Sequence, residues 1–272
     1  MAKTPSPLAQ NPLPIIVALI LLALFVFAKP SWIFLLEVIL LLAVIVFALR
    51  NEVLGLLTLI VLRPAVDVLG TSVLLSVRGI SLNVASAMSL IAIPWVIYRL
   101  AVHRANLRTT PLFWPILAFM TVCGLGVLTS VVPSISIEEF IRLASVFLLY
   151  LLAYHIIVTP HEARQFRQAF VLSLVAPVAA GIFEFITNTG LSFGELSNRI
   201  FGTFGHPNVF AFYLVLALAF FFAGVSLSPK RVRREVWLGL GLLVVLLGLT
   251  LTRGAWIGLI LVAATLGFVR HR

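Results

Sequence analysis

The sequence predicts an all-α, polytopic integral membrane protein, a bundle of about ten transmembrane helices with both termini in the cytoplasm. Two features of composition point to it: hydrophobic residues make up 62% of the 272 residues, and charged residues only 10%. Apolar side chains this dense exceed what the core of a soluble domain can bury. The third observation is that apolar runs recur at intervals close to the roughly 20 residues that a helix needs to cross a bilayer.

Charged residues, prolines and glycines separate the apolar runs. We expect helices over 14–28, 32–49, 53–69, 80–98, 111–130, 139–158, 168–187, 208–227, 236–252 and 254–269. Only Lys29-Pro30-Ser31 separates the first two and only Arg253-Gly254 the last two, so either pair could instead form one bent or re-entrant element. Pro94, Pro115 and Pro177 fall inside predicted helices and should kink them.

The positive charges predict the orientation of these helices. Alternate loops on one side hold Lys3, Arg50, Arg99, Arg104, Arg108, Arg164, Arg167, Lys230, Arg231, Arg233, Arg234, Arg270 and Arg272. The other side holds Lys29, Arg63, Arg78, Arg142, Arg199 and Arg253. Because basic residues accumulate in short cytoplasmic loops, we place the richer side in the cytoplasm and the turns near 70–79, 131–138, 188–207 and 252–254 outside. Short clusters between apolar runs, without a basic face, do not favour nucleic acid as a partner of this chain of net charge +10.

Arg253 is the strongest single candidate for binding a ligand. Its guanidinium lies at the predicted membrane boundary, between an apolar run and Gly254, and needs an anionic partner. Arginine presents a planar, permanently charged fork that matches phosphate oxygens, and Gly254 would let the backbone approach them. The alternative is an arginine that extends to the membrane interface between two helices without binding a ligand.

A second polar segment precedes Arg253 on the same predicted side. Its candidate residues are Arg199, Gly202, Thr203, Gly205, His206, Pro207 and Asn208. The two glycines supply backbone freedom, Pro207 suits the first turn of a helix, and Asn208 or His206 can cap exposed N–H groups. A turn into a helix N-terminus attracts anions, and Arg199 adds positive potential. A well-capped outer loop is the alternative, and capping is favoured over a catalytic role for His206.

These segments resemble the start of the core region of the O-antigen ligase and O-antigen polymerase superfamily. The residues that carry the resemblance are Gly202-Thr203-Phe204-Gly205-His206-Pro207-Asn208, followed by Thr252-Arg253-Gly254. The family consists of multi-pass glycosyltransferases of the bacterial inner membrane, which act in lipopolysaccharide and other cell-envelope polysaccharide biosynthesis. The resemblance implies N-terminal transmembrane helices over 1–198 and the start of the core region over 199–272.

The resemblance also implies an activity. Such enzymes move a glycan from undecaprenyl diphosphate to a lipid A core sugar, a growing polysaccharide or a protein, and they require no metal or cofactor. By this resemblance Arg253 would hold the lipid diphosphate, and His206 occupies a variable position and is not the catalytic histidine of the family. Gly254, which lets the backbone approach, and Arg199, which adds positive potential, complete the candidate residues for binding the diphosphate. Two other functions stay open, a lipid-linked glycan flippase or transporter and a non-catalytic membrane partner.

Proteins of this family generally continue into a large external loop that carries another arginine and a histidine base. Nothing after Arg253 resembles that loop, and the sequence ends at Arg272. We therefore expect a truncated chain that keeps a diphosphate site and lacks the residues for acid–base chemistry, so its catalytic residues are unknown.

Two charged pairs have structural interpretations. Arg63 and Asp67 are four residues apart beside Pro64, a spacing that favours an ion pair on one helical face. Glu138 and Arg142 have the same spacing at the expected start of a helix, where an acidic residue also suits the helix dipole.

Other polar residues give weaker signals. Glu37 and Glu184 lie in apolar stretches, where an unpaired carboxylate would be neutral or face a cavity, and they are proton-relay candidates. They are too few to favour a transporter strongly. His161-Glu162 begins like a zinc-protease helix but lacks the second histidine, so no metal site is expected. Cys123 is expected to be a buried structural thiol.

Overall fold

The computed structural model describes residues 32–66, 75–77, 80–82, 84–193, 196–227 and 234–270. These residues are mostly helical, as the sequence predicts. Contacts divide the chain into two compact units, one formed within Met1–Leu62 and Leu69–Phe170, the other within Arg63–Val68 and Val171–Arg272. The division falls inside two helices.

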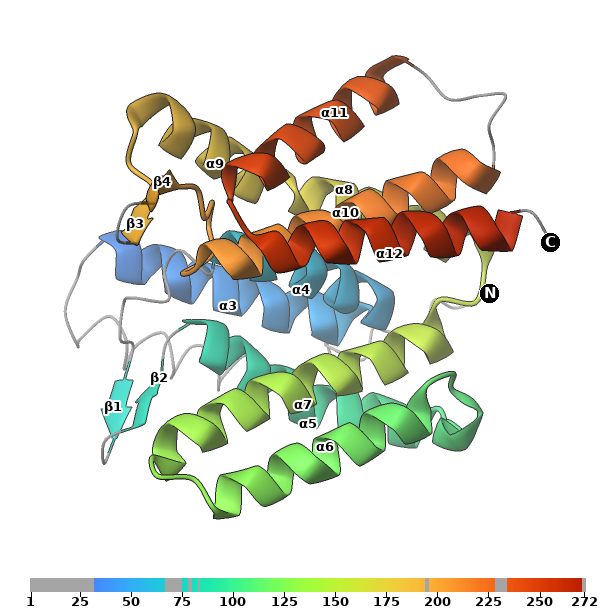
Figure 1. Ribbon diagram of the computed structural model, residues 1–272. Coiled ribbons are helices and arrows are strands. Elements are labelled where there is room, and N and C mark those ends of the chain that lie inside the picture. Colours follow the sequence, from blue (N-terminus) through green and yellow to red (C-terminus); the bar gives the residue numbers. More distant parts are fainter. Residues whose placement is uncertain are drawn as a thin grey trace. The chain divides into compact units, whose positions relative to one another are not determined.

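Figure 1 shows the elements. In chain order they are α3 (Trp32–Arg50), α4 (Glu52–Val66), β1 (Leu75–Val77), β2 (Ile80–Leu82), α5 (Val84–Val102), the short 3₁₀ helix η2 (Leu107–Thr109), α6 (Phe113–Leu128), α7 (Pro133–Ile156), α8 (Pro160–Ser173), α9 (Val175–Thr187), β3 (Leu191–Phe193), β4 (Leu196–Arg199), α10 (Pro207–Leu227), α11 (Arg234–Leu249) and α12 (Arg253–Arg270). Every expected helix that falls on described residues corresponds to one or two of these helices. The expected helix over 14–28 lies outside the described residues.

Two short antiparallel hairpins depart from the all-α expectation. In the first, β1 and β2 pair Leu75 with Leu82 and Val77 with Ile80. In the second, β3 pairs with β4 through an irregular register. Each hairpin joins two helices, so the fold remains a helical one.

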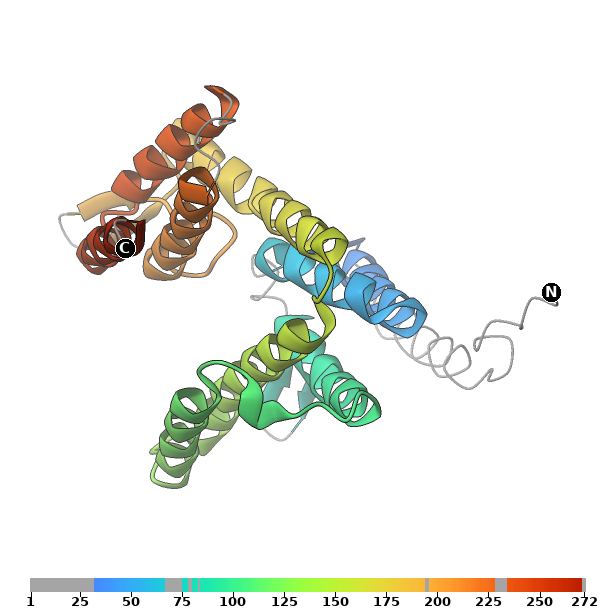
Figure 2. The same cartoon turned by 90° about the vertical axis from the view of Figure 1, so that its right-hand side faces the viewer.

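The first unit is built around α5 and α7. Helix α5 packs on α7, α6 packs on the other side of α7, and α3 packs on α5, as the green helices of Figure 2 illustrate for α5, α6 and α7. Its core cluster consists of Leu56, Val96, Leu100, Leu151, Leu152 and Ile156. On α5 and α7 these side chains recur at helical spacing, and Leu56 of α4 joins them in one apolar core.

The predicted pair of Glu138 and Arg142 is confirmed. Arg142 Nη2 lies 2.6 Å from Glu138 Oε1, and Arg142 Nη1 lies 2.7 Å from Glu139 Oε1. Ser86 of α5 donates a hydrogen bond of 2.7 Å to the same Glu138 oxygen, so the pair also ties α5 to α7. Helix α7 begins at Pro133, earlier than expected, because proline is tolerated in the first turn. Glu138 is therefore one turn too far inside the helix to act mainly on its dipole.

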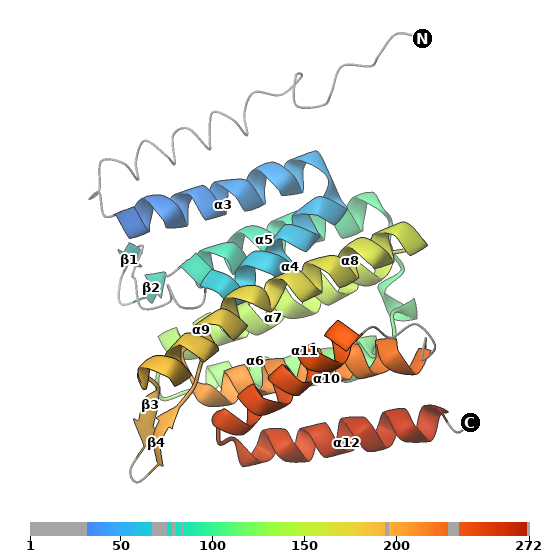
Figure 3. The same ribbon diagram turned by 90° about the horizontal axis from the view of Figure 1, so that it is seen from above.

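Proline 177 breaks the predicted helix over 168–187. Without an N–H group, Pro177 cannot donate to the carbonyl of Ser173, where α8 ends. Leu174 keeps right-handed helical angles, with φ −76° and ψ −21°, and α9 begins at the next residue. The two helices therefore continue nearly end to end, as Figure 3 shows.

Helices α10 and α12 run side by side in the second unit (Figure 1). A Cβ atom added to Gly254 would lie 3.8 Å from the ring of Phe212, and one added to Gly258 would lie 3.8 Å from Val215. Small residues four positions apart allow two helix backbones to approach closely. Gly254 and Gly258 thus form the contact face of α12.

Within the described part of the chain, two helical stretches are both long and apolar enough to cross a membrane, Pro160–Thr187 and Pro207–Gly224. Shorter apolar helices accompany them over Val38–Arg50, Ser86–Val102, Phe113–Leu128, Val236–Leu249 and Arg253–Phe268. The length and composition of these helices support the assignment of the chain as a membrane protein.

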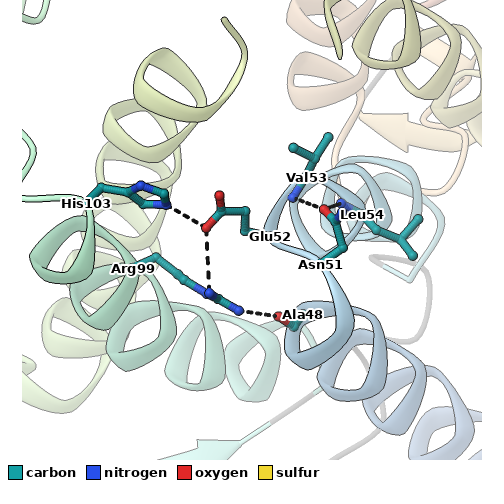
Figure 4. Close-up of polar contacts among 7 residues, drawn as sticks. All are labelled: Ala48, Asn51, Glu52, Val53, Leu54, Arg99 and His103. Carbon is teal, nitrogen blue, oxygen red and sulfur yellow. Dashed lines mark hydrogen bonds and ion pairs between the residues drawn. The ribbon is translucent and has the colours of Figure 1, made fainter. Parts of the chain in front are cut away.

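A polar cluster lies where the chain turns from α3 into α4 and contacts the end of α5 (Figure 4). Asn51 caps α4 by accepting the N–H groups of Val53 and Leu54 at 2.8 and 3.2 Å. Glu52 Oε2 lies 2.7 Å from His103 Nε2 and 3.7 Å from Arg99 Nη1. The chain therefore turns at the predicted break at Arg50. Asn51 caps α4 there, and Glu52 contacts Arg99 of α5 and His103 just after it.

We predict that Glu52→Ala lowers stability more than Glu139→Ala does. The first substitution removes the carboxylate from Arg99, whose Nε atom is buried without a partner among the described residues. That loss should cost about 1 to 3 kcal/mol. Glu139 is 61% exposed, and Arg142 keeps Glu138 when it is lost, so the control should cost less than about 1 kcal/mol. Thermal unfolding of the two purified variants in detergent measures both losses of stability. Equal unfolding temperatures for Glu52→Ala and Glu139→Ala would contradict the role given to Glu52.

Candidate functional site

The candidate site lies in the second unit, where the β3–β4 hairpin delivers Arg199. Helix α9 ends at Thr187, and Asn188 adopts left-handed angles with φ 59°. Asn198 Oδ1 accepts the N–H of Gly190 at 2.8 Å across the hairpin. The short hairpin reverses the chain and places Arg199 beside the link between α11 and α12.

The guanidinium of Arg199 joins three segments. Its Nε atom donates to the carbonyl of Thr250 at 2.8 Å, and its Nη2 atom donates to Asn208 Oδ1 at 2.9 Å and Thr252 Oγ1 at 3.1 Å. Thr252 Oγ1 also lies 3.2 Å from Asn208 Oδ1. The predicted residues Arg199 and Asn208 therefore meet, through Thr252, directly beside Arg253.

Gly202 is required by the backbone of the loop. Its φ angle is +63°, and a Cβ atom there would lie 2.8 Å from the carbonyl oxygen of Pro177. Only glycine adopts such angles without strain. Gly205 differs, because a Cβ atom there would meet nothing within 4 Å and its φ is not positive. The predicted need for backbone freedom is confirmed at Gly202 alone.

Glu184 anchors this loop, a role that the sequence analysis missed. Its side chain is buried, with 7% exposed, and its Oε2 atom accepts the N–H groups of Phe201 and Gly202, both at 2.8 Å. Glu184 is therefore not the unpaired carboxylate expected of a proton relay. Glu37, the other relay candidate, has a side chain outside the described ones.

Aromatic packing holds the rest of the loop. The ring of Phe204 stacks on that of Phe210, with centroids 5.9 Å apart. The centroids of the Phe204 and Tyr213 rings are 5.1 Å apart. Buried Thr203 donates to the carbonyl of Pro64 at 2.6 Å. That carbonyl belongs to the last turn of α4, where carbonyls lack helical partners. Thr203 is thus a structural residue.

The entry into α10 follows the predicted capping pattern. Pro207 is the first residue of α10. The His206 carbonyl accepts the N–H groups of Val209 and Phe210, and the His206 Nδ1 atom accepts the N–H of Asn208 at 3.1 Å. The capping role of His206 is confirmed, while Asn208 directs its side-chain oxygen to Arg199 instead.

A sharp turn separates α11 from α12. Buried Thr250 donates to the Leu247 carbonyl at 2.7 Å, and Leu251 adopts left-handed angles with φ 51°. Helix α12 then starts at Arg253.

Arg253 is exposed at the first position of α12. Among the described residues its guanidinium has no hydrogen-bond or ion-pair partner, and the N–H groups of Arg253 and Gly254 have no acceptor. The positive end of the helix dipole lies at the same place. The arrangement combines a permanent charge with unsatisfied donors, and it can bind an anion.

Other sequence candidates lie apart from this network. Glu162 accepts the N–H groups of Val158 and Thr159 at 2.9 and 2.8 Å, and Thr159 Oγ1 accepts the N–H of Glu162. This is a capping box at the start of α8, which the Thr159-x-x-Glu162 spacing could have revealed.

The pairing of Arg63 with Asp67 involves a residue outside the described ones. Cys123 is partly exposed, not buried as expected.

No protein-family model, curated protein or solved structure matches this chain. In the parts that the structure describes, no three His, Cys, Asp or Glu side chains gather as metal ligands would. The geometry around Arg253 therefore has to be interpreted on its own chemistry.

We predict that Gly202→Ala destabilises the second unit by about 1 to 3 kcal/mol, because alanine is strained at positive φ and its Cβ would contact the Pro177 carbonyl. Gly205→Ala is the matched control and should change stability by less than about 0.5 kcal/mol, since it meets open space. Thermal unfolding in detergent compares them. A Gly205→Ala loss as large as that of Gly202→Ala would show that the loop is not held by the positive φ of Gly202.

Proposed function

We propose that this chain is a multi-pass protein of the bacterial inner membrane that binds the diphosphate of an undecaprenyl diphosphate-linked glycan at Arg253. The observation that carries the proposal is the exposed guanidinium at the start of α12, which lacks a partner among the described residues, beside N–H groups that lack acceptors. The resemblance of Thr252-Arg253-Gly254 to O-antigen ligases names the anion.

The chemistry of a diphosphate suits this arrangement. A guanidinium donates two parallel hydrogen bonds to phosphate oxygens, and helix N-terminal N–H groups bind phosphate through their donors and the helix dipole. Gly254 has no side chain to keep a ligand from the backbone. Arg253 would therefore hold one phosphate while the first turn of α12 donates to the other.

Arg199 has a positioning role in this proposal. Its hydrogen bonds to Thr250, Asn208 and Thr252 fix the backbone on both sides of the α11–α12 turn. The loop of Gly202, Thr203, Gly205, His206 and Pro207 leads from Arg199 to the first turn of α10, where Asn208 accepts a hydrogen bond from Arg199. These residues shape the site, and Arg253 with Gly254 contacts the ligand.

The proposed activity is the donor side of O-antigen ligase-like glycosyl transfer. A glycan leaves the lipid diphosphate and joins a lipid A core sugar, a polysaccharide or another acceptor. Negative charge grows on the departing diphosphate, and the positive charge of Arg253 would stabilise it. His206 caps α10 and is assigned no proton transfer, so the proposal names no catalytic base in this chain.

The proposed topology has about ten transmembrane helices and cytoplasmic termini, because of the asymmetry of Lys and Arg between alternate loops. We predict that reporters fused after Arg104 and Arg164 are active in the cytoplasm and that one fused after Ser197 is active outside. Paired alkaline phosphatase and fluorescent protein fusions measure this. A cytoplasmic signal after Ser197 would place the candidate site on the wrong side of the membrane for an external glycan.

The binding proposal predicts that Arg253→Ala weakens binding of an undecaprenyl diphosphate glycan by about tenfold to a hundredfold, the loss of one charged hydrogen-bonding group. Arg164→Ala is the control, because Arg164 is also exposed near a helix start but stands on the predicted cytoplasmic side. Titration of the full chain in nanodiscs measures both affinities. Equal effects of the two substitutions would reduce Arg253 to a residue that only sets topology.

A further inference from the structure

Two helix starts adjoin each other in the second unit, and they differ in how their backbone donors are satisfied. At the start of α10, the N–H groups of residues 208–210 donate to the side chain or the carbonyl of His206. At the start of α12, the N–H groups of Arg253 and Gly254 have no acceptor among the described residues. Backbone donors that can bind a phosphate are therefore open on α12, whereas those of the first turn of α10 are already used.

The side-chain amide of Asn208, at the start of α10, has a fixed orientation. Its Oδ1 atom accepts a hydrogen bond from Arg199 Nη2 at 2.9 Å and another from Thr252 Oγ1 at 3.2 Å. A guanidinium can only donate, so the oxygen of the amide and not its nitrogen must face Arg199. The Nδ2 atom is bonded to the other side of Cγ, and its two N–H groups are therefore directed away from Arg199.

These two N–H groups are available to a ligand. Asn208 is exposed, and its Nδ2 atom has no acceptor among the residues that the structure describes. The amide lies beside the start of α12, because Thr252, which it contacts, immediately precedes Arg253. The candidate site thus has an uncharged donor of fixed orientation next to a charged one, and such polar groups determine which neutral part of a ligand is accepted.

We propose that Asn208 Nδ2 donates a hydrogen bond to the sugar residue that is bonded directly to the lipid diphosphate. The site would then select a glycosylated lipid diphosphate over a lipid diphosphate without a sugar. The hydroxyl and ring oxygens of a sugar are uncharged acceptors, which a neutral amide can pair with, while the phosphates occupy the charged donors at Arg253. This inference rests on the proposed function, and it adds a residue that recognises the glycan itself.

The experiment compares two lipids that differ only at the position of the sugar. One is undecaprenyl diphosphate that carries a single glucose residue, and the other is the cyclohexyl ester of undecaprenyl diphosphate. Both have the same lipid, the same charge on the diphosphate and a six-membered ring, but the cyclohexyl ring has no oxygen to accept a hydrogen bond. A substitution that acts only on the diphosphate therefore changes both affinities by the same factor.

Titration of the full chain in nanodiscs measures the two affinities. We expect the glucosyl lipid to bind about fivefold more tightly than the cyclohexyl ester, which corresponds to one neutral hydrogen bond. Asn208→Ala should remove this preference. Thr252→Ala is the matched control, because Thr252 also contacts Arg199 but its described hydrogen bonds all lie within the protein. The control should lower both affinities by the same factor and keep the preference.

Equal binding of the two lipids to the unaltered chain would overturn the role given to Asn208. A preference that survives Asn208→Ala would overturn it too, including the case in which both affinities fall alike because the amide contacts the diphosphate. Binding of the cyclohexyl ester shows that a variant is folded. If Asn208→Ala is not folded, Asn208→Ser offers Arg199 an acceptor but is too short to reach the sugar, and it should remove the preference in the same way.

Arg253→Ala separates this inference from the proposed function. It should weaken binding of both lipids by the same factor, because both carry the diphosphate. If Arg253→Ala leaves both affinities unchanged, the diphosphate site itself is wrong. If it weakens both while the unaltered chain shows no preference for the glucosyl lipid, only the contact between Asn208 and the sugar is wrong.

Discussion

The guanidinium of Arg199 is the interaction on which the candidate site depends. Nothing else described in the second unit ties the end of β4, the first turn of α10 and the α11–α12 link together through side-chain hydrogen bonds. An arginine can do this because its donors diverge in a rigid plane, so that Nε and Nη2 reach different acceptors. A lysine could not hold the three segments in one geometry.

The hydrogen bonds of Thr252 leave the first turn of α12 without a side-chain cap. Threonine at the position before a helix usually accepts an N–H of the first turn. Here Thr252 Oγ1 is bonded to Arg199, Asn208 and the Thr250 carbonyl, and none of its described bonds goes to α12. The donors at the start of α12 are therefore left to an external acceptor, which an exposed arginine at the same position helps to attract.

The helices could be predicted from the sequence because each depends on its own apolar run. The entry into α10 could be predicted too, since Pro207 and His206 act on neighbouring backbone groups. Glu184 could not, because its partners Phe201 and Gly202 are brought to it only when the β3–β4 hairpin folds back. The hairpins escaped notice because the alternation of Leu75-Ser76-Val77 is hidden in a chain that is apolar almost throughout.

Polar side chains of the second unit meet beside the α11–α12 turn, and the packed apolar part of α10 helps to hold them there. Between Asn208 at one end of α10 and Phe221 toward the other lie buried residues such as Leu214 and Leu218, each 0% exposed. Such a closely packed segment leaves α10 little freedom to shift, so Asn208 at its start stays within hydrogen-bonding distance of Arg199.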